Sequence, residues 1–216
     1  MSNQITYYES KEEKLNVITH FIGLILSVVA LVLLVVYASL YGTAKHIVSF
    51  SIFGASLIVL YAASTAYHYS QSPKLRNRLN IFDHAAIYVL IAGTYTPFAL
   101  IILKGWIGWT IFGISWGLAF AGIIFKLFFI GKYDKISTVT YVLMGWVIIF
   151  AIKPLIENFS TNGLLWLLAG GLFYTLGAVL YSIKKINYNH AIFHVFVLLG
   201  SFSHFIAVFF YVLPEQ

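Results

Sequence analysis

The stretch NVITHFIGLILSVVALVLLVVYASLY, residues 16–41, contains no charged side chain and decides the fold class of this chain. A helix needs roughly 20 predominantly apolar residues to cross the hydrocarbon core of a bilayer. This stretch exceeds that length. It therefore predicts a transmembrane helix from Asn16 to Tyr41.

The rest of the chain repeats this pattern. Of its 216 residues 61% are hydrophobic and only 9% are charged, and the mean hydropathy is +0.90, which no ordinary soluble domain of this length shows. Six further apolar stretches predict spans at Ile47 to Tyr69, Ile81 to Leu103, Trp106 to Phe129, Ser137 to Ile156, Gly163 to Ile183 and His190 to Leu213. We expect one all-α bundle of seven transmembrane helices over residues 16–213, with no second domain.

The distribution of cationic residues predicts the orientation of this bundle. Ten of the thirteen Lys and Arg residues fall in the N-terminal tail, residues 1–15, or in the second, fourth and sixth loops, whereas Lys45, Lys104 and Lys153 lie on the opposite side. Cytoplasmic loops carry an excess of Lys and Arg. We therefore expect a cytoplasmic N-terminus and an external C-terminus in a cell membrane. The polar start is not typical of a cleaved signal peptide, so the first span is expected to direct insertion.

Composition also excludes several kinds of site and partner. The chain has no cysteine, which excludes disulfides, iron–sulfur clusters and thiolate zinc sites. Any metal must be held by His, Asp or Glu. The net charge of +6 lies in loops and fits the charge bias of membrane proteins, so no nucleic-acid partner is expected.

Five histidines map onto the predicted cytoplasmic ends of four spans, namely His20, His68, His84, His190 and His194. His190 and His194 are four residues apart and therefore share one helical face. His68 reaches the same predicted depth from another span. Three histidine ligands with one open position are the usual catalytic arrangement for zinc. These residues therefore predict a metal site at His68, His190 and His194, and histidine-rich ligation favours zinc over manganese or iron, although imidazole serves several metals.

Two further polar residues are candidates for catalysis. Asp83 opens the third span in LNIFDHAAIYVL, where an intramembrane carboxylate marks a functional site by default. The alternative is a carboxylate solvated at the interface or paired with Arg76 or Arg78. Ser64 precedes His68 by one helical turn and could orient a ligand, a water or a substrate carbonyl. The alternative is a serine that hydrogen-bonds to its own helix or packs as a small residue.

The remaining polar and aromatic residues have simpler interpretations. His84 diverges from Asp83 by about 100° of helix rotation, so Asp83 is favoured as the inward residue. His204 lies about 21 Å beyond His190 along a helix, too far to bind the same ion, and is expected to face the interior. His46 falls in an outer loop and is assigned no role.

Helix-shaping residues carry expectations of their own. Pro97 frees a carbonyl near Gly93 and predicts a kink or a polar pocket. Four tryptophans near span ends predict interfacial anchoring and core filling, and small residues within spans predict close helix contacts. The tryptophans are Trp106, Trp109, Trp146 and Trp166; the small residues are Gly54, Ser56, Gly113, Gly117, Gly170, Gly171 and Gly177.

Together these residues resemble the hemolysin III-like branch of the progestin and adipoQ receptor family. The resemblance is carried by Glu13, Asn16 and His20 in EKLNVITH, Ser64 and His68 in STAYH, Asp83 to Pro97 in DHAAIYVLIAGTYTP, and His190, His194 and His204 in HAIFHVFVLLGSFSH. It implies seven spans, a cytoplasmic N-terminus, and zinc held by His68, His190 and His194, with Asp83 contacting it through water and Ser64 close by. The short tails resemble the bacterial branch.

Three functions follow as hypotheses. The first is a zinc-dependent hydrolase of lipid amides or esters, because the resemblance extends to a superfamily containing alkaline ceramidases. In it zinc would lower the pKa of water to about 7, and Asp83 would act as general base. The second is a cytolytic, pore-forming protein, which the family name suggests. The third is a lipid receptor or sensor with structural zinc.

Two transport functions have less support. A proton or ion transporter stays open, although few polar residues continue across the membrane. A retinal pump is excluded because no lysine follows His190. The expected partner is a membrane lipid, which would be the substrate in the hydrolase hypothesis.

Overall fold

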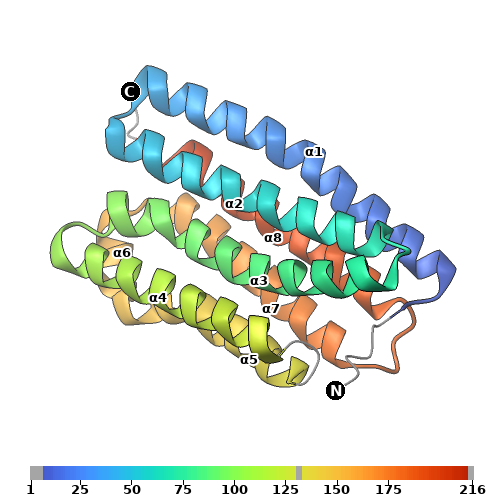
Figure 1. Ribbon diagram of the computed structural model, residues 1–216. Helices are drawn as coiled ribbons and strands as arrows, with labels where there is room; N and C mark the ends of the chain where they lie inside the picture. Colours follow the sequence, from blue (N-terminus) through green and yellow to red (C-terminus); the bar gives the residue numbers. More distant parts are fainter. Residues whose placement is uncertain (1–6, 130–132, 214–216) are drawn as a thin grey trace.

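The computed structural model describes residues 7–129 and 133–213, and the helices in these ranges form one bundle (Figure 1). Residues 1–6 of the predicted tail lie outside the described residues. No strand occurs in the described ranges. The elements are α1 Ser10–Tyr41, α2 Ala44–Tyr69, α3 Pro73–Pro97, η1 Phe98–Ile102, α4 Gly105–Phe129, α5 Asp134–Gly145, η2 Val147–Ala151, α6 Ile152–Asn158, α7 Thr161–Ser182 and α8 Asn189–Tyr211.

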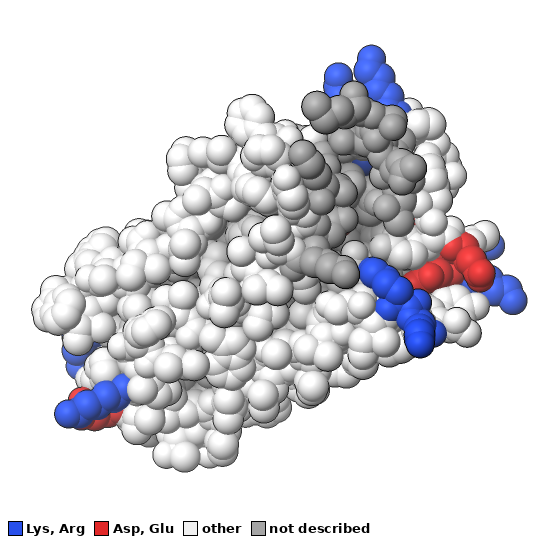
Figure 2. All heavy atoms as spheres, turned by 90° about the horizontal axis from the view of Figure 1, so that it is seen from below, with Lys and Arg blue, Asp and Glu red and all other residues white. Residues whose placement is uncertain are grey.

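Seven helical segments of the described chain are long and apolar enough to cross a membrane, as predicted. The third segment is α3 continued by η1, and the fifth is α5, η2 and α6 together. Large apolar side chains are exposed around the bundle, such as Leu26 at 57%, Leu143 at 65% and Phe150 at 89%. In Figure 2 the charged side chains gather at the two ends, and the broad surface between them carries none on the face shown. The chain is therefore an integral multi-pass membrane protein.

The third segment occupies the centre of the bundle. Within its most apolar window 72% of the residues are buried, against 22% for α1 and for α7. It packs against α2 on one side and α4 on the other, while α8 packs against α1 and α7 (Figure 1). The start of α1 and the end of α8 lie at opposite ends of the bundle. Which end faces the cytoplasm stays a prediction from the charge bias.

Pro97 reshapes the third segment as expected. It has no amide hydrogen for the Gly93 carbonyl, and a π-helical turn, η1, follows it. The amide of Leu103 donates to the carbonyl of Phe98 at 2.8 Å, a bond that spans five residues. The hydroxyl of Thr96 donates to the carbonyl of Ala92 at 2.9 Å, so the distorted backbone gains a side-chain donor.

The fifth span contains a break that the sequence analysis did not predict. Its helix changes to the 3₁₀ segment η2 at Trp146. Tyr95 from α3 stabilises this break, because its hydroxyl donates to the carbonyl of Gly145 at 2.7 Å and accepts the amide hydrogen of Ile148 at 3.0 Å. Trp146 lies in mid-span and donates to the Thr175 hydroxyl at 3.0 Å, so its interpretation as an interfacial anchor is wrong.

Several helices begin earlier than the apolar pattern predicts. The first begins at Ser10, not near Asn16, and the third at Pro73, not near Ile81. His46 lies in the first turn of α2, where its Nδ1 accepts the amide hydrogen of Thr43 at 3.1 Å, and not in a loop. Polar residues that were assigned to tails and loops are therefore parts of helices.

The small residues fall into two groups. An added Cβ at Gly54, Gly170 or Gly177 would lie within 3 Å of a neighbouring side chain, which confirms close helix contact there. At Gly113 and Gly117 an added Cβ would meet nothing within 4 Å. The packing interpretation is wrong for these two residues.

Candidate metal centre

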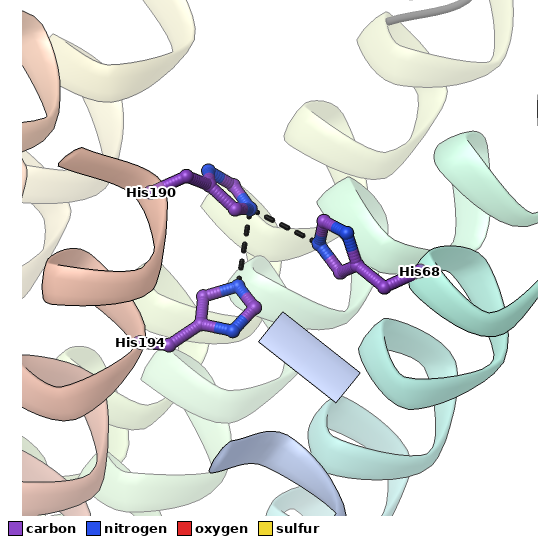
Figure 3. Close-up of side chains that lie close together, drawn as sticks. All are labelled: His68, His190 and His194. Atoms are coloured by element: carbon purple, nitrogen blue, oxygen red, sulfur yellow. Dashed lines mark hydrogen bonds between the residues drawn. The ribbon is translucent and has the colours of Figure 1, made fainter. Parts of the chain in front are cut away.

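Three histidines meet at one end of the bundle, inside the protein. His68 comes from the last turn of α2, and His190 and His194 come from the first turns of α8 (Figure 3). The Nε2 atom of His190 lies 3.0 Å from Nε2 of His68 and 3.1 Å from Nε2 of His194. One nitrogen from each ring lies within 4.8 Å of the others, and all three side chains are buried. The predicted convergence of these residues is confirmed.

The outer ring nitrogens of this group are held by other residues. Nδ1 of His68 donates to the carboxylate of Glu13 at 2.8 Å, and Nδ1 of His194 donates to the carbonyl of Asn16 at 3.3 Å. A neutral imidazole has one N–H and one lone pair. The Nε2 atoms of His68 and His194 therefore both present lone pairs to the same point, next to His190.

This arrangement fits a metal ion. Nε2 of His190 carries at most one hydrogen, so it can satisfy only one of the two lone pairs beside it. Lone pairs brought to 3 Å inside a protein are costly unless a cation lies between them. Fixing the far nitrogen of a ligating histidine with a carboxylate or a carbonyl is also typical of metal sites. The three histidines could hold one metal ion.

A buried ion pair supports His68 from behind. Glu13 pairs with the guanidinium of Arg76, whose side chain is only 1% exposed. Arg76 also donates to the carbonyls of Tyr67 at 3.1 Å and Ser70 at 3.3 Å, at the end of α2. The pair thus joins the first turns of α1 and α3 to the helix end that carries His68.

The segment before α1 covers the group on its outer side. The Tyr8 ring stacks on His190 with ring centroids 4.6 Å apart, and its amide donates to Glu13 at 3.1 Å. Burial raises the pKa of the Tyr8 phenol, so Tyr8 stays neutral over the physiological range. Glu12 accepts the amide hydrogen of His190 at 3.1 Å, where α8 begins. These contacts join α1 to α8 around the site.

We call His68, His190 and His194 the metal group. His20 is close to this group but is not part of it. Its ring stacks on His194 with centroids 3.5 Å apart and an interplanar angle of 9°. The side chain is 3% exposed, and neither ring nitrogen has a hydrogen-bond partner among the described residues. A buried imidazole with two unpaired nitrogens is available to a ligand.

The two predicted catalytic residues line a cavity whose wall also includes two of the three histidines. The cavity has a volume of about 160 Å³, and His190, His194, Ser64 and Asp83 all contribute to its wall. Ser64 is 1% exposed, and its hydroxyl has no partner among the described residues. Ser64 therefore does not hydrogen-bond to its own helix, whereas the alternative in which it packs as a small residue stays open.

Asp83 and His84 both face this cavity. Asp83 is 8% exposed, and its Oδ2 lies 3.9 Å from Nδ1 of His84. His84 Nδ1 lies 2.9 Å from the carbonyl of Asn80, one turn earlier. Asp83 is therefore buried against the cavity and not solvated at the interface. Its catalytic role stays a prediction.

The residues behind the ligands were missed by the sequence analysis. From the sequence, Glu13 is only part of a family motif, and Arg76 is a cationic loop residue or an alternative partner for Asp83. One signal was available: on a helix that starts earlier, Glu13, Asn16 and His20 recur at three- and four-residue intervals and share one face. Nothing in the sequence indicates that Arg76 pairs with a residue 63 positions away.

Comparison with known proteins shows the family of this chain. A family model described as "Haemolysin-III related" matches residues 8–205. "Hemolysin-3" of Bacillus cereus is 52% identical over 94% of this chain and 93% of its own length, and the "Hemolysin-3 homolog" of Bacillus subtilis (strain 168) is 50% identical over 93% and 94%. The human "Monocyte to macrophage differentiation factor" is 30% identical over 74% of this chain and 68% of its own length. The chain belongs to the haemolysin-III related family.

Proposed function

We propose that this protein is a zinc-dependent hydrolase that cleaves an amide or ester bond of a membrane lipid. One observation carries the proposal: two of the three convergent histidines, His190 and His194, line a cavity whose wall also contains the Asp83 carboxylate and the unpaired Ser64 hydroxyl. A purely structural site would be closed by protein ligands. Here a metal bound by the three histidines would have an open coordination position toward the cavity.

Zinc is the metal that this donor set fits best. All three donors are imidazole nitrogens, and cysteine is absent from the chain. Imidazole suits zinc, copper, iron and nickel, and three protein ligands with an open position are typical of catalytic zinc. When bound, zinc supplies a Lewis acid that polarises a carbonyl and lowers the pKa of water.

Residues of the chain would transfer the proton, stabilise the developing negative charge and bind the acyl chain. The Asp83 carboxylate accepts a proton from the attacking water and returns it to the leaving nitrogen or oxygen. The Ser64 hydroxyl, which has no partner in the described chain, donates a hydrogen bond to the scissile carbonyl oxygen as negative charge develops there. The apolar walls hold the acyl chain and exclude bulk water.

The test uses purified protein in lipid nanodiscs with a panel of N-acyl amides and acyl esters. We expect the Asp83→Asn variant to keep its metal while hydrolysis falls by a factor of about 10²–10⁴, the usual contribution of a general base. The Ser64→Ala variant should lose less hydrolytic activity, because only one neutral hydrogen-bond donor is removed. A parent protein with full metal content that cleaves no member of the panel would contradict the proposal.

A second candidate is membrane damage, which the printed name of the Bacillus cereus relative favours. Purified protein would be added to liposomes that contain a self-quenched dye. Under our proposal, leakage is absent, or it disappears when His68, His190 and His194 are replaced by alanine. Leakage that is equal with and without these histidines would support a pore instead.

We also propose that the protein lies in the bacterial cell membrane with the metal centre near the cytoplasmic face. The two Bacillus relatives match over nearly the whole chain, and the charge bias supports the orientation. Reporter fusions would test this: green fluorescent protein should fluoresce at the N-terminus, and alkaline phosphatase should be active at the C-terminus. The reverse pattern would overturn the orientation.

A further inference from the structure

Two cavities meet inside the bundle, and His204 lies where they meet. The first has a volume of about 160 Å³ and contains His190 and His194 in its wall. The second has about 250 Å³ and is otherwise lined almost entirely by apolar side chains of the spans beyond. Six residues line both cavities, namely Thr94, Tyr95, Gly145, Trp146, Gly171 and His204. The two cavities therefore adjoin, and His204 belongs to the wall of both.

The second cavity lies directly beneath the lipid-facing surface. Ile149 and Leu168, which line it, are also 52% and 48% exposed on the outside of the bundle. The 3₁₀ segment η2 forms part of this wall. A lipid chain that starts at the metal group would thus run past His204 toward the hydrocarbon.

His204 is held in one tautomer by its neighbour. Its Nε2 lies 3.1 Å from the carbonyl of Leu167, which can only accept, so Nε2 carries the hydrogen. In the neutral ring Nδ1 is then a bare acceptor. This nitrogen has no partner among the described residues, although the side chain is only 7% exposed.

The fold makes room for this ring at one particular place. A Cβ added to Gly170 would lie 2.1 Å from Cδ2 of His204, so α7 has a glycine where the ring packs. The Cδ2–Nε2 edge is therefore against α7, and Nδ1 is on the other edge. An unpaired acceptor in an apolar setting is costly, and it would be satisfied by a ligand that brings a donor.

The separation from the metal group defines what that ligand must carry. His204 follows His194 by ten residues on the same helix, a rise of about 15 Å. A lipid whose carbonyl lies at the metal group would pass the middle of its acyl chain next to His204. The walls around it are mainly Ile, Leu, Phe, Trp and Gly, with few competing acceptors.

We propose that Nδ1 of His204 accepts a hydrogen bond from a hydroxyl group in the middle of the acyl chain, and so selects hydroxylated acyl lipids. This inference rests on the proposed function for the position of the carbonyl. The selectivity arises because an unhydroxylated chain leaves the buried nitrogen unpaired.

The first experiment uses the unaltered, metal-loaded protein and three ligands. Binding of stearic acid, a mid-chain hydroxystearic acid and its methyl ether would be measured by displacement of a fluorescent fatty acid. We expect the hydroxy acid to bind about five- to tenfold more tightly than the other two, the usual net value of one hydrogen bond. Equal binding of the hydroxy acid and its methyl ether would overturn the inference, because the ether has no donor.

Variants then locate the selectivity. His204→Phe should abolish the preference, and so should Gly170→Ala, which displaces the ring without removing it. Tyr174→Phe is the matched control: its ring lies 5.4 Å from His204 in the same cavity wall, but its hydroxyl is bonded to Ser201. It should keep the preference. A preference that survives in His204→Phe would overturn the assignment to His204.

The outcome is separable from the hydrolase proposal. Binding is read without turnover, and metal content is measured on the same samples. A His204-dependent preference without any hydrolysis would refute the enzyme and uphold the acyl-chain site. Equal hydrolysis of lipids with hydroxylated and unhydroxylated acyl chains would uphold the enzyme and refute the acyl-chain site.

Discussion

The two ends of α8 use histidine in opposite ways. At its start, His190 and His194 meet His68, and the outer nitrogens of His68 and His194 are held by residues of α1. Farther along, His204 stands alone, with one nitrogen fixed by a backbone carbonyl and the other unpaired in an apolar cavity. The residues that hold the outer nitrogens make the difference. Where α1 fixes two N–H groups outward, lone pairs converge, and the three histidines could hold a metal ion. At His204 a carbonyl of α7 fixes one nitrogen, and a single acceptor remains.

We expect the largest effect on this contrast, a loss of stability, when Arg76 is replaced. Arg76→Ala leaves the Glu13 carboxylate without its cation and frees carbonyls at the end of α2. Removal of one partner of a buried pair costs about 3–5 kcal/mol. We expect a loss of that size in thermal or denaturant stability in detergent. Arg78→Ala, on the exposed side of the same helix, is the control and should change stability by less than about 0.5 kcal/mol. Equal effects at the two positions would contradict the account.

A smaller change at Glu13 sharpens the comparison at the metal itself. Glu13→Ala removes the acceptor that fixes the His68 tautomer. Loss of such an outer partner lowers metal affinity by about 10–100-fold, and competition with a fluorescent chelator would measure it. Glu13→Gln keeps an acceptor oxygen and should lose less. The exposed Glu9→Ala is the control and should bind as the parent does. An unchanged affinity in Glu13→Ala would show that His68 needs no support.

The smallest expected effect concerns the apolar part of the bundle. Gly113→Ala should change stability by less than about 1 kcal/mol, toward stabilisation, because the added methyl meets nothing and glycine is a poor helix former. Gly54→Ala should destabilise, since its Cβ would lie 2.6 Å from Leu31. Thermal unfolding of the two variants in parallel checks this. Destabilisation by Gly113→Ala would mean that this face of α4 packs on something after all.

The parts of the molecule that depend on chain-local patterns were predictable. Apolar length alone predicts all seven spans, and the spacing of His190 and His194 with the depth of His68 predicts the metal group. Pro97 predicts the distortion that η1 shows. Each of these signals is confined to one helix or to its position in the membrane.

The features that the sequence did not predict depend on contacts between residues far apart in the chain. The break in the fifth span is stabilised by the Tyr95 hydroxyl, about 50 residues earlier in the chain, so no local pattern marks it. Arg76 looks like any positive loop residue until α1 supplies Glu13. The unpaired nitrogen of His204 is visible only once Leu167 is placed beside it. A sequence shows which groups are present, but only packing shows which of them are left without partners.

The metal content of the purified protein tests the central claim most directly. After loading with zinc and removal of free ion, we expect close to one zinc per chain in the parent and almost none in His68→Ala, His190→Ala or His194→Ala. His46→Gln, at the opposite end of α2, should retain the parent's content. Zinc retained in all three alanine variants, or no bound zinc in the folded parent, would contradict the account.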